Sequence, residues 1–242
     1  MILTIGAAAA RCSCSQGEKK TQDTDFHYLL DEFADLKVIR FRVPGWDNLS
    51  LRQKEYAYHL SEAAKLGRDI TWDQYCKWNL PIRHVVEDIL NEYEGDRECA
   101  DFQNFTVYAK RLFFANGIHH HYSEDKFFPE CPKEYFQSLM EAVGDGEQAT
   151  ELLEVIYSPD IYPQRRSTSK TGDIVELSAV NFYDGVTREE VDKYYNSMMD
   201  PNDKTPISYG LNTKVVKEDG KVVEKPWKVG GIYGPALVKI CA

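Results

Sequence analysis

The chain has 242 residues, of which 43% are apolar and 12% aromatic, so it is long enough to bury a sizeable core in one or two globular domains. Its formal net charge is -10, and no dense run of Lys and Arg is present to neutralise phosphates, which argues against nucleic acid as a partner. No apolar run approaches the roughly 20 residues that cross a bilayer, which argues against a transmembrane segment.

Residues 1–25 differ in composition from the rest of the chain. Residues 1–10 are mostly small and apolar, and Arg11-Cys12-Ser13-Cys14 leads into a polar stretch that ends at Asp25. This pattern resembles the remnant of an export signal before a lipid-modifiable cysteine, followed by a disordered tether. The alternative is a disordered tail from a misplaced start codon. We expect a periplasmic or lipid-anchored protein if residues 1–25 are a signal remnant, and a cytoplasmic protein otherwise.

The cysteines are scattered along the chain, and no pair has the Cys-x-x-Cys spacing of a zinc finger. Single cysteines distributed in this way over 242 residues are more often free thiols than disulfide partners. We therefore expect free thiols at Cys12, Cys14, Cys76, Cys99, Cys131 and Cys241.

The first ordered elements are expected between residues 26 and 67. Residues 33–44 have the pattern of a short segment that is extended or partly helical. Ser50-Leu-Arg-Gln53 is a capping box, which predicts a helix to about Leu66 with Gly67 at the position after its C-terminus. The predicted buried stripe of this helix is Tyr56, Leu60, Ala63 and Ala64.

Further helices are expected between residues 71 and 157. Thr71-Trp-Asp-Gln74 is a second capping box and predicts a short helix, which Pro81 interrupts or restarts because proline fits a first helical turn. We predict helices over residues 81–93, from Asp101 to Asn116, and over 132–143 and 147–157. The aromatic stripe of the helix from Asp101 is interpreted as core, without chemistry of its own.

The pattern changes after residue 158, where a long loop leads to residues 173–183. Thr187-Arg-Glu-Glu190 is a third capping box and predicts a helix to about Met198. Two strand-like stretches then flank Glu218-Asp219-Gly220, which predicts a hairpin because Asp-Gly supplies the positive φ angles of a tight turn. Gly231 to Pro235 opens an apolar segment interpreted as a helix start. The sequence thus predicts an α+β fold with a mainly helical N-terminal part followed by a β-hairpin.

The most distinctive stretch runs from Phe113 to Pro129 and contains three consecutive histidines among aromatic residues. Asn116 and Gly117 both tolerate the left-handed conformation that ends a helix, so the histidines are expected on a loop. Such a loop could be a polar, aromatic-walled binding site. The alternative is a structural turn whose outer histidines are only solvated. Adjacent side chains diverge, so we expect no high-affinity zinc site at residues 119–121.

No catalytic motif is complete in the 242 residues. None of the six histidines is followed by Glu, so the His-Glu-x-x-His zinc helix is absent. The Gly-x-Ser-x-Gly elbow and the glycine loop that cradles phosphate are absent as well.

Four separated segments, in the same order, resemble the dipeptidyl peptidase III family, most closely its Bacteroides-type bacterial members. They are Tyr56-Ala-Tyr-His-Leu-Ser-Glu-Ala-Ala-Lys-Leu-Gly67, Asn116-Gly-Ile-His-His-His-Tyr122 with Lys126-Phe-Phe-Pro129, Ser178-Ala-Val-Asn-Phe-Tyr183, and Ser208-Tyr-Gly-Leu-Asn212. The resemblance covers the chain from about Asp31 onward, and only the N-terminal part of the family's chain.

The resemblance implies a function. Family members are two-lobed zinc exopeptidases that release dipeptides from the N-terminus of oligopeptides. By this likeness residues 26–242 are part of the lower lobe, which combines helices with a small β-barrel and forms one wall of the cleft. The zinc-binding residues belong to a C-terminal catalytic lobe, so we expect this chain alone to bind no zinc and to be inactive.

The resemblance also implies site residues. His121 and Tyr122 are the candidates for contact with the oligopeptide substrate, and Asn116 and Gly117 shape the turn before them. No residue of this chain is predicted to be catalytic or to bind metal. The competing hypothesis is a non-catalytic helical module that binds a peptide or a metal ion.

Overall fold

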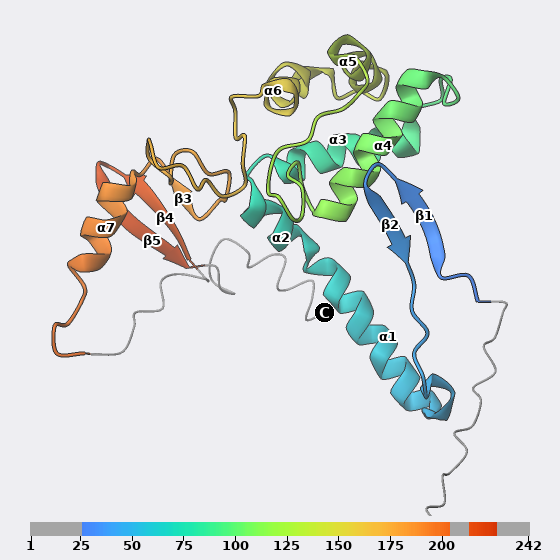
Figure 1. Cartoon of the computed structure of the whole chain (residues 1–242), viewed down its shortest axis with the longest axis horizontal. Coiled ribbons are helices and arrows are strands. Elements are labelled where there is room, and N and C mark those ends of the chain that lie inside the picture. Colours follow the sequence, from blue (N-terminus) through green and yellow to red (C-terminus); the bar gives the residue numbers. More distant parts are fainter. Residues whose placement is uncertain (1–25, 204–212, 227–242) are drawn as a thin grey trace, which may run out of the picture.

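A computed structural model describes residues 26–203 and 213–226, and it has a mixed α+β fold that is mainly helical (Figure 1). This confirms the predicted fold class. The strands are β1 (Leu29–Phe33), β2 (Leu36–Ile39), β3 (Tyr183–Asp184), β4 (Thr213–Glu218) and β5 (Lys221–Pro226). The α-helices are α1 (Leu51–Leu66), α2 (Arg68–Tyr75), α3 (Asn79–Glu92), α4 (Ala100–Ala115), α5 (Lys133–Ala142), α6 (Gly146–Tyr157) and α7 (Arg188–Asn196).

Helices α2 to α6 form a helical body around one large apolar core. Helices α3 to α6 each contribute several buried side chains and α2 contributes Trp72, so the core includes Trp72, Ile89, Phe105, Leu139 and Leu153. Since α4 buries Phe102, Phe105, Tyr108 and Leu112 at helical spacing, its aromatic stripe is core, as predicted. This body carries the loop with the three histidines.

A smaller module of three strands and one helix lies at the opposite side of the molecule from the β1–β2 hairpin (Figure 1). Strand β3 pairs parallel with β4, and β4 pairs antiparallel with β5. Asp219 and Gly220 have φ angles of 49° and 76°, as the predicted tight turn requires. Val191 and Tyr195 of α7 pack with Val215 in a separate core. Within the described residues this sheet is open, so the small β-barrel implied by the resemblance is not formed there.

The N-terminal arm, which we define as residues 26–66, has a different character from the body. Residues 33–44, whose class the sequence left open, contribute to an antiparallel hairpin of β1 and β2. Helix α1 begins at the predicted capping box, where Ser50 accepts a hydrogen bond from the Gln53 amide. It extends away from the helical body, and none of its residues is buried (Figure 1).

The predicted buried stripe of α1 is therefore wrong. Tyr56 and Leu60 are 67% and 52% exposed, Ala64 is exposed, and Ala63 is only partly buried. The 3.6-residue period was present in the sequence, but burial also requires an element to pack against the apolar face. Within residues 26–203 and 213–226 no element covers that face of α1.

Two of the predicted helix boundaries are also corrected. Gly67 is right-handed, with a φ angle of -78°, and the chain passes directly from α1 into α2. As a consequence Thr71 lies inside α2 and does not cap a helix. Pro81 does lie in the first turn of α3, as predicted.

Several predictions fall on residues that are not described. These are the signal remnant at residues 1–25, Ser208 to Asn212 of the resemblance, and the apolar segment after Gly231. Among the cysteines of the described part, Cys76, Cys99 and Cys131 are free, as expected. No helix in that part is long and apolar enough to cross a bilayer.

Candidate functional site

The candidate site is the loop between α4 and α5, and it starts at the C-terminus of α4. Asn116 is left-handed, with a φ angle of 56°, and the Gly117 amide donates a hydrogen bond of 3.1 Å to the Leu112 carbonyl. This is the helix ending that the sequence predicted, and it places the histidines on a loop. The polypeptide therefore leaves α4 in a fixed direction.

Gly117 and Asn79 together hold the first residues of the loop. Gly117 has a φ angle of 148°, and a Cβ atom there would overlap the amide of Asn79. The Asn79 side chain is fully buried, and its oxygen accepts a hydrogen bond of 3.2 Å from the Ile118 amide. Its nitrogen donates to the Trp72 carbonyl at 3.0 Å. Only glycine fits this close approach, so the loop is clamped to α2 and α3.

His119 points into the body and is 2% exposed. Its Nε2 lies 2.9 Å from the Tyr162 carbonyl oxygen, so that nitrogen carries the proton and donates it. Burial lowers the pKa of His119 to about 4, which keeps the ring neutral at physiological pH. His119 thus ties the loop to the segment that follows α6.

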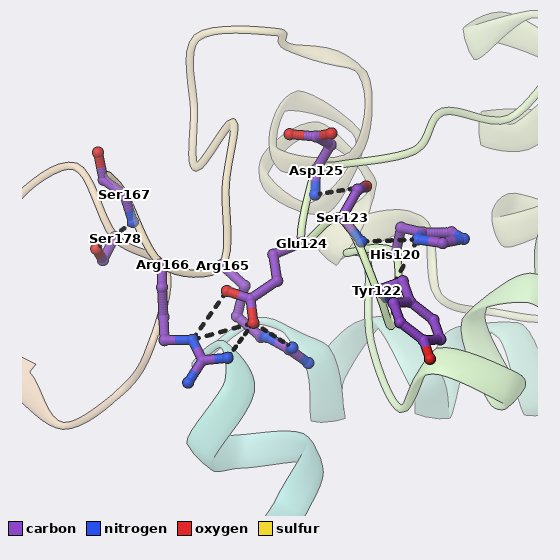
Figure 2. A network of polar contacts seen from close by, with 9 residues as sticks. All are labelled: His120, Tyr122, Ser123, Glu124, Asp125, Arg165, Arg166, Ser167 and Ser178. Atoms are coloured by element: carbon purple, nitrogen blue, oxygen red, sulfur yellow. Dashed lines mark hydrogen bonds and ion pairs between the residues drawn. The ribbon is translucent and has the colours of Figure 1, made fainter. Parts of the chain in front are cut away.

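His120 acts inside the loop (Figure 2). Its Nδ1 accepts hydrogen bonds from the backbone amides of Tyr122, at 3.2 Å, and Ser123, at 3.1 Å. Its Nε2 lies 3.1 Å from Asp35 Oδ2, in the turn between β1 and β2. Because Nδ1 accepts from two amides, the ring proton belongs on Nε2, which donates to Asp35.

His121 and Tyr122, the predicted substrate contacts, form an aromatic tip together with Phe114. The His121 ring centroid lies 5.0 Å from that of Phe114 and 5.3 Å from that of Tyr122. Tyr122 is 86% exposed and Phe114 41%, whereas His121 is half-buried between them. Burial and the adjacent His120 lower the pKa of His121, so its ring is neutral at physiological pH. Such a surface can pack an apolar side chain and offer one imidazole nitrogen.

Glu124 fixes the loop just after the aromatic tip through two arginines. Its carboxylate accepts hydrogen bonds from Arg165 Nη2, at 2.7 Å, and from Arg166 Nε, at 2.8 Å (Figure 2). The Arg166 and Arg165 hydrogen bonds lower the pKa of Glu124 to about 2. Arg165 is buried and lies over the Tyr75 ring of α2, 4.3 Å from its centroid. The loop is thus held from both sides.

Lys126 is a further buried anchor. Its ammonium donates to the Ser158 and Ile161 carbonyls at 2.6 and 2.7 Å, just beyond the C-terminus of α6. Burial lowers the pKa of Lys126 to about 8. Sequence reasoning missed Lys126, Glu124, Arg165 and Asp35 as parts of this site, because their partners lie 32 to 85 residues away in the chain. A run of two arginines was the only local signal.

Two of the segments that carry the family resemblance meet in a short backbone ladder. Gln164 bridges Asp125 on one side and Ser178 on the other. The amides of Ala179 and Val180 donate to the carbonyls of Gln164 and Arg165, at 3.2 and 3.1 Å. The histidine loop and residues 178–183 therefore flank the same segment, residues 163–166.

The residues of the described part do not offer a metal site. His119 and His120 are bonded to different oxygens, and no group of three or more His, Cys, Asp or Glu residues converges anywhere in residues 26–203 and 213–226.

No protein-family model matches the chain, and no curated protein matches it significantly.

Proposed function

We propose that this chain is the N-terminal part of a zinc exopeptidase of the dipeptidyl peptidase III type, and that the aromatic tip binds the first residues of an oligopeptide substrate. The observation that carries this proposal is the meeting of two resemblance segments, residues 116–129 and 178–183, at one ladder beside the exposed Tyr122.

The role of this chain in such an enzyme is to bind and orient the peptide. The aromatic face of Tyr122 packs a substrate side chain, and His121 offers a hydrogen bond to the peptide backbone. When bound, zinc would lower the pKa of its water to about 7 and polarise the scissile carbonyl. The described residues do not fit a zinc site, and the 242 residues contain no His-Glu-x-x-His motif, so no catalytic step is assigned to them.

The same aromatic tip also supports the second candidate, a non-catalytic module that binds peptides. An exposed aromatic residue beside a half-buried imidazole can hold a peptide without turning it over. The coding DNA downstream of this sequence separates the two. An open frame that encodes His-Glu-x-x-His, or its one-residue-longer variant, supports the enzyme, and an early stop without that motif nearby supports the module.

Peptide binding itself can be tested on the 242-residue chain. A tetrapeptide that carries benzoylphenylalanine at its second position is irradiated with the protein, and the labelled residues are identified by mass spectrometry. We expect labelling at Phe114, His121 or Tyr122, and its loss in Tyr122→Ala. The control is Tyr58→Ala, which removes a 61% exposed tyrosine from α1. Labelling that is spread over α1 and is unchanged in Tyr122→Ala would count against the proposal.

A further inference from the structure

We propose that His120 is a positioning residue, which holds the aromatic tip in place while its imidazole is neutral and releases it when the imidazole gains a second proton. His120 itself does not contact the substrate. The expected effect of His120 on peptide binding rests on the proposed function, but the release of the aromatic tip does not.

The geometry of His120 is that of a side-chain cap for a turn. An acceptor on residue i that receives the amides of residues i+2 and i+3 is usually the oxygen of Asn, Asp, Ser or Thr. Here the acceptor is Nδ1 of His120, at 3.2 Å from the Tyr122 amide and 3.1 Å from the Ser123 amide. Figure 2 shows both hydrogen bonds directed into the turn that carries Tyr122. Unlike an amide oxygen, this acceptor can be protonated.

Asp35 determines which nitrogen of His120 carries the first proton. Its own backbone hydrogen bond, and the hydrogen bond from His120, lower the pKa of the Asp35 carboxyl. Asp35 is therefore an anion at neutral and mildly acidic pH, and it keeps a proton on the Nε2 atom that faces it. The second proton can then enter only at Nδ1.

A proton at Nδ1 converts the acceptor into a donor that faces two other donors. The hydrogen bonds to the Tyr122 and Ser123 amides must then break, while the ion pair with Asp35 becomes stronger. Imidazole is the side chain that undergoes this change between about pH 5 and 8. The neutral ring is thus the form that holds the turn.

The rest of the loop stays fixed when these two bonds break. The His120 amide donates to the Asp125 carbonyl at 2.8 Å, and the Glu124 amide donates to the His120 carbonyl at 3.0 Å. Glu124 also keeps its pairing with Arg165 and Arg166. The expected movement is confined to Tyr122 and Ser123, between these fixed points.

The charged and titratable groups around His120 come from three elements. Those beside the ring or its partner are Asp35 in the β1–β2 turn, Arg111 on α4, and His121 in the same loop. The charge of Arg165 acts on His121 and helps to lower its pKa. The pKa values of His119 and His121 are both lowered, so these two rings retain their neutral form further into acid. Of the three rings, only His120 accepts hydrogen bonds from the Tyr122 and Ser123 amides, so it is the ring whose protonation would break them.

The test is nuclear magnetic resonance of the 242-residue chain between pH 7.5 and 5.5. Long-range ¹H–¹⁵N spectra should report a proton on Nε2 of His120 at pH 7.5. After correction for the intrinsic pH dependence, hydrogen exchange of the Tyr122 and Ser123 amides should become roughly tenfold faster at pH 5.5. The Ile118 amide, bonded to the buried Asn79 side chain, is the internal control and should not change.

One variant separates hydrogen-bond acceptance by residue 120 from its protonation, and a second variant is the control. His120→Asn keeps a side-chain oxygen for both amides but cannot be protonated, so exchange of Tyr122 and Ser123 should become independent of pH. His59→Asn removes an exposed imidazole on α1 and should leave the wild-type behaviour intact. Wild-type amides that do not respond to pH, or the same response in His120→Asn, would overturn the proposal.

Binding of the benzoylphenylalanine tetrapeptide separates this inference from the proposed function. If both hold, the apparent Kd of the wild type rises at pH 5.5, and that of His120→Asn does not. If the amides respond to pH but no peptide binds, the positioning role stands and the proposed function fails. If the peptide binds but the amides are insensitive to pH, the positioning role is overturned.

Discussion

The helical body and the N-terminal arm each contain a helix with a clear local signal in the sequence, and these two helices differ sharply in burial. Helix α4 of the body and α1 of the arm each have 16 residues, yet α4 buries six side chains and α1 buries none. The arm instead exposes Phe41, Val43, Leu51 and Tyr56 by more than 65%. Local signals define a helix and its ends, but a core exists only where another element meets the apolar face.

The largest expected effect comes from emptying the core of the body. Phe105 is fully buried, and its ring centroid lies 5.1 Å from that of Phe136. Phe105→Ala should reduce the free energy of unfolding by about 4 kcal/mol, through lost burial and the cavity that remains. The matched arm variant Tyr56→Ala should change it by less than about 0.5 kcal/mol. Urea unfolding measures the free energy of unfolding of both variants. Equal losses would show that the body and the arm do not differ in packing.

The next effect tests the clamp at the start of the loop. Gly117→Ala must strain a backbone with a φ angle of 148° and also displace Asn79, so we expect a loss of about 3 kcal/mol. Gly144→Ala also has a positive φ angle, 90°, but a Cβ atom there meets nothing within 4 Å, and it should cost only about 1 kcal/mol. A similar loss in both variants would mean that Asn79 moves aside freely.

The ion pair at the loop of the helical body should contribute more to stability than an ion pair on the arm. Glu124→Gln removes the anion that the buried Arg165 faces, and we expect a loss of about 2 kcal/mol at neutral pH. On the arm, Glu62 pairs with Lys65 at the surface, and Glu62→Gln should cost less than about 0.5 kcal/mol.

The Glu124 pair also predicts a pH dependence with a definite sign. Its folded pKa of about 2 lies below the ordinary 4.5, so its contribution to stability is fully present above pH 4.5 and is lost as the pH falls toward 2. The difference in unfolding free energy between wild type and Glu124→Gln should therefore shrink across that window. A difference that stays constant down to pH 2 would show that the charge of Glu124 is not what stabilises the loop.

The smallest effect on stability is expected at the aromatic tip. Tyr122 is 86% exposed, so Tyr122→Ala should change the melting temperature very little. In a complete enzyme the same variant should raise KM for oligopeptide substrates and leave kcat nearly unchanged, because it removes a contact made equally in ground and transition states. A lowered melting temperature with an unaltered ranking of substrates would assign Tyr122 a scaffold role.

The elements with strong local signals were the predictable ones. The capping boxes at Ser50 and Thr187, the helix end at Asn116 and the turn at Asp219 were all confirmed, because each depends on contacts within a few residues. The loop position of the histidines followed from them. Thr71 failed because α2 starts directly after α1, which places a capping sequence inside a helix.

The partners within the candidate site could not be predicted. The three histidines are identical in sequence terms, yet one is buried against Tyr162, one caps a turn and one supports the aromatic tip. These roles depend on residues 35, 114 and 162, whose proximity is created by the tertiary fold. The sequence likewise showed no sign that Glu124 and Lys126 are anchors of the loop, because their partners are distant in the chain.

The buried amine of Lys126 has a practical consequence for chemical labelling. Because burial is the cause of its lowered pKa of about 8, this shift belongs to the closed state, and the exposed amine reacts like that of an ordinary lysine. It is only 7% exposed and is bonded to two carbonyls, so a reagent reaches it only when the turn after α6 detaches. The rate of Lys126 acylation relative to the exposed Lys37 therefore measures how often the turn after α6 opens.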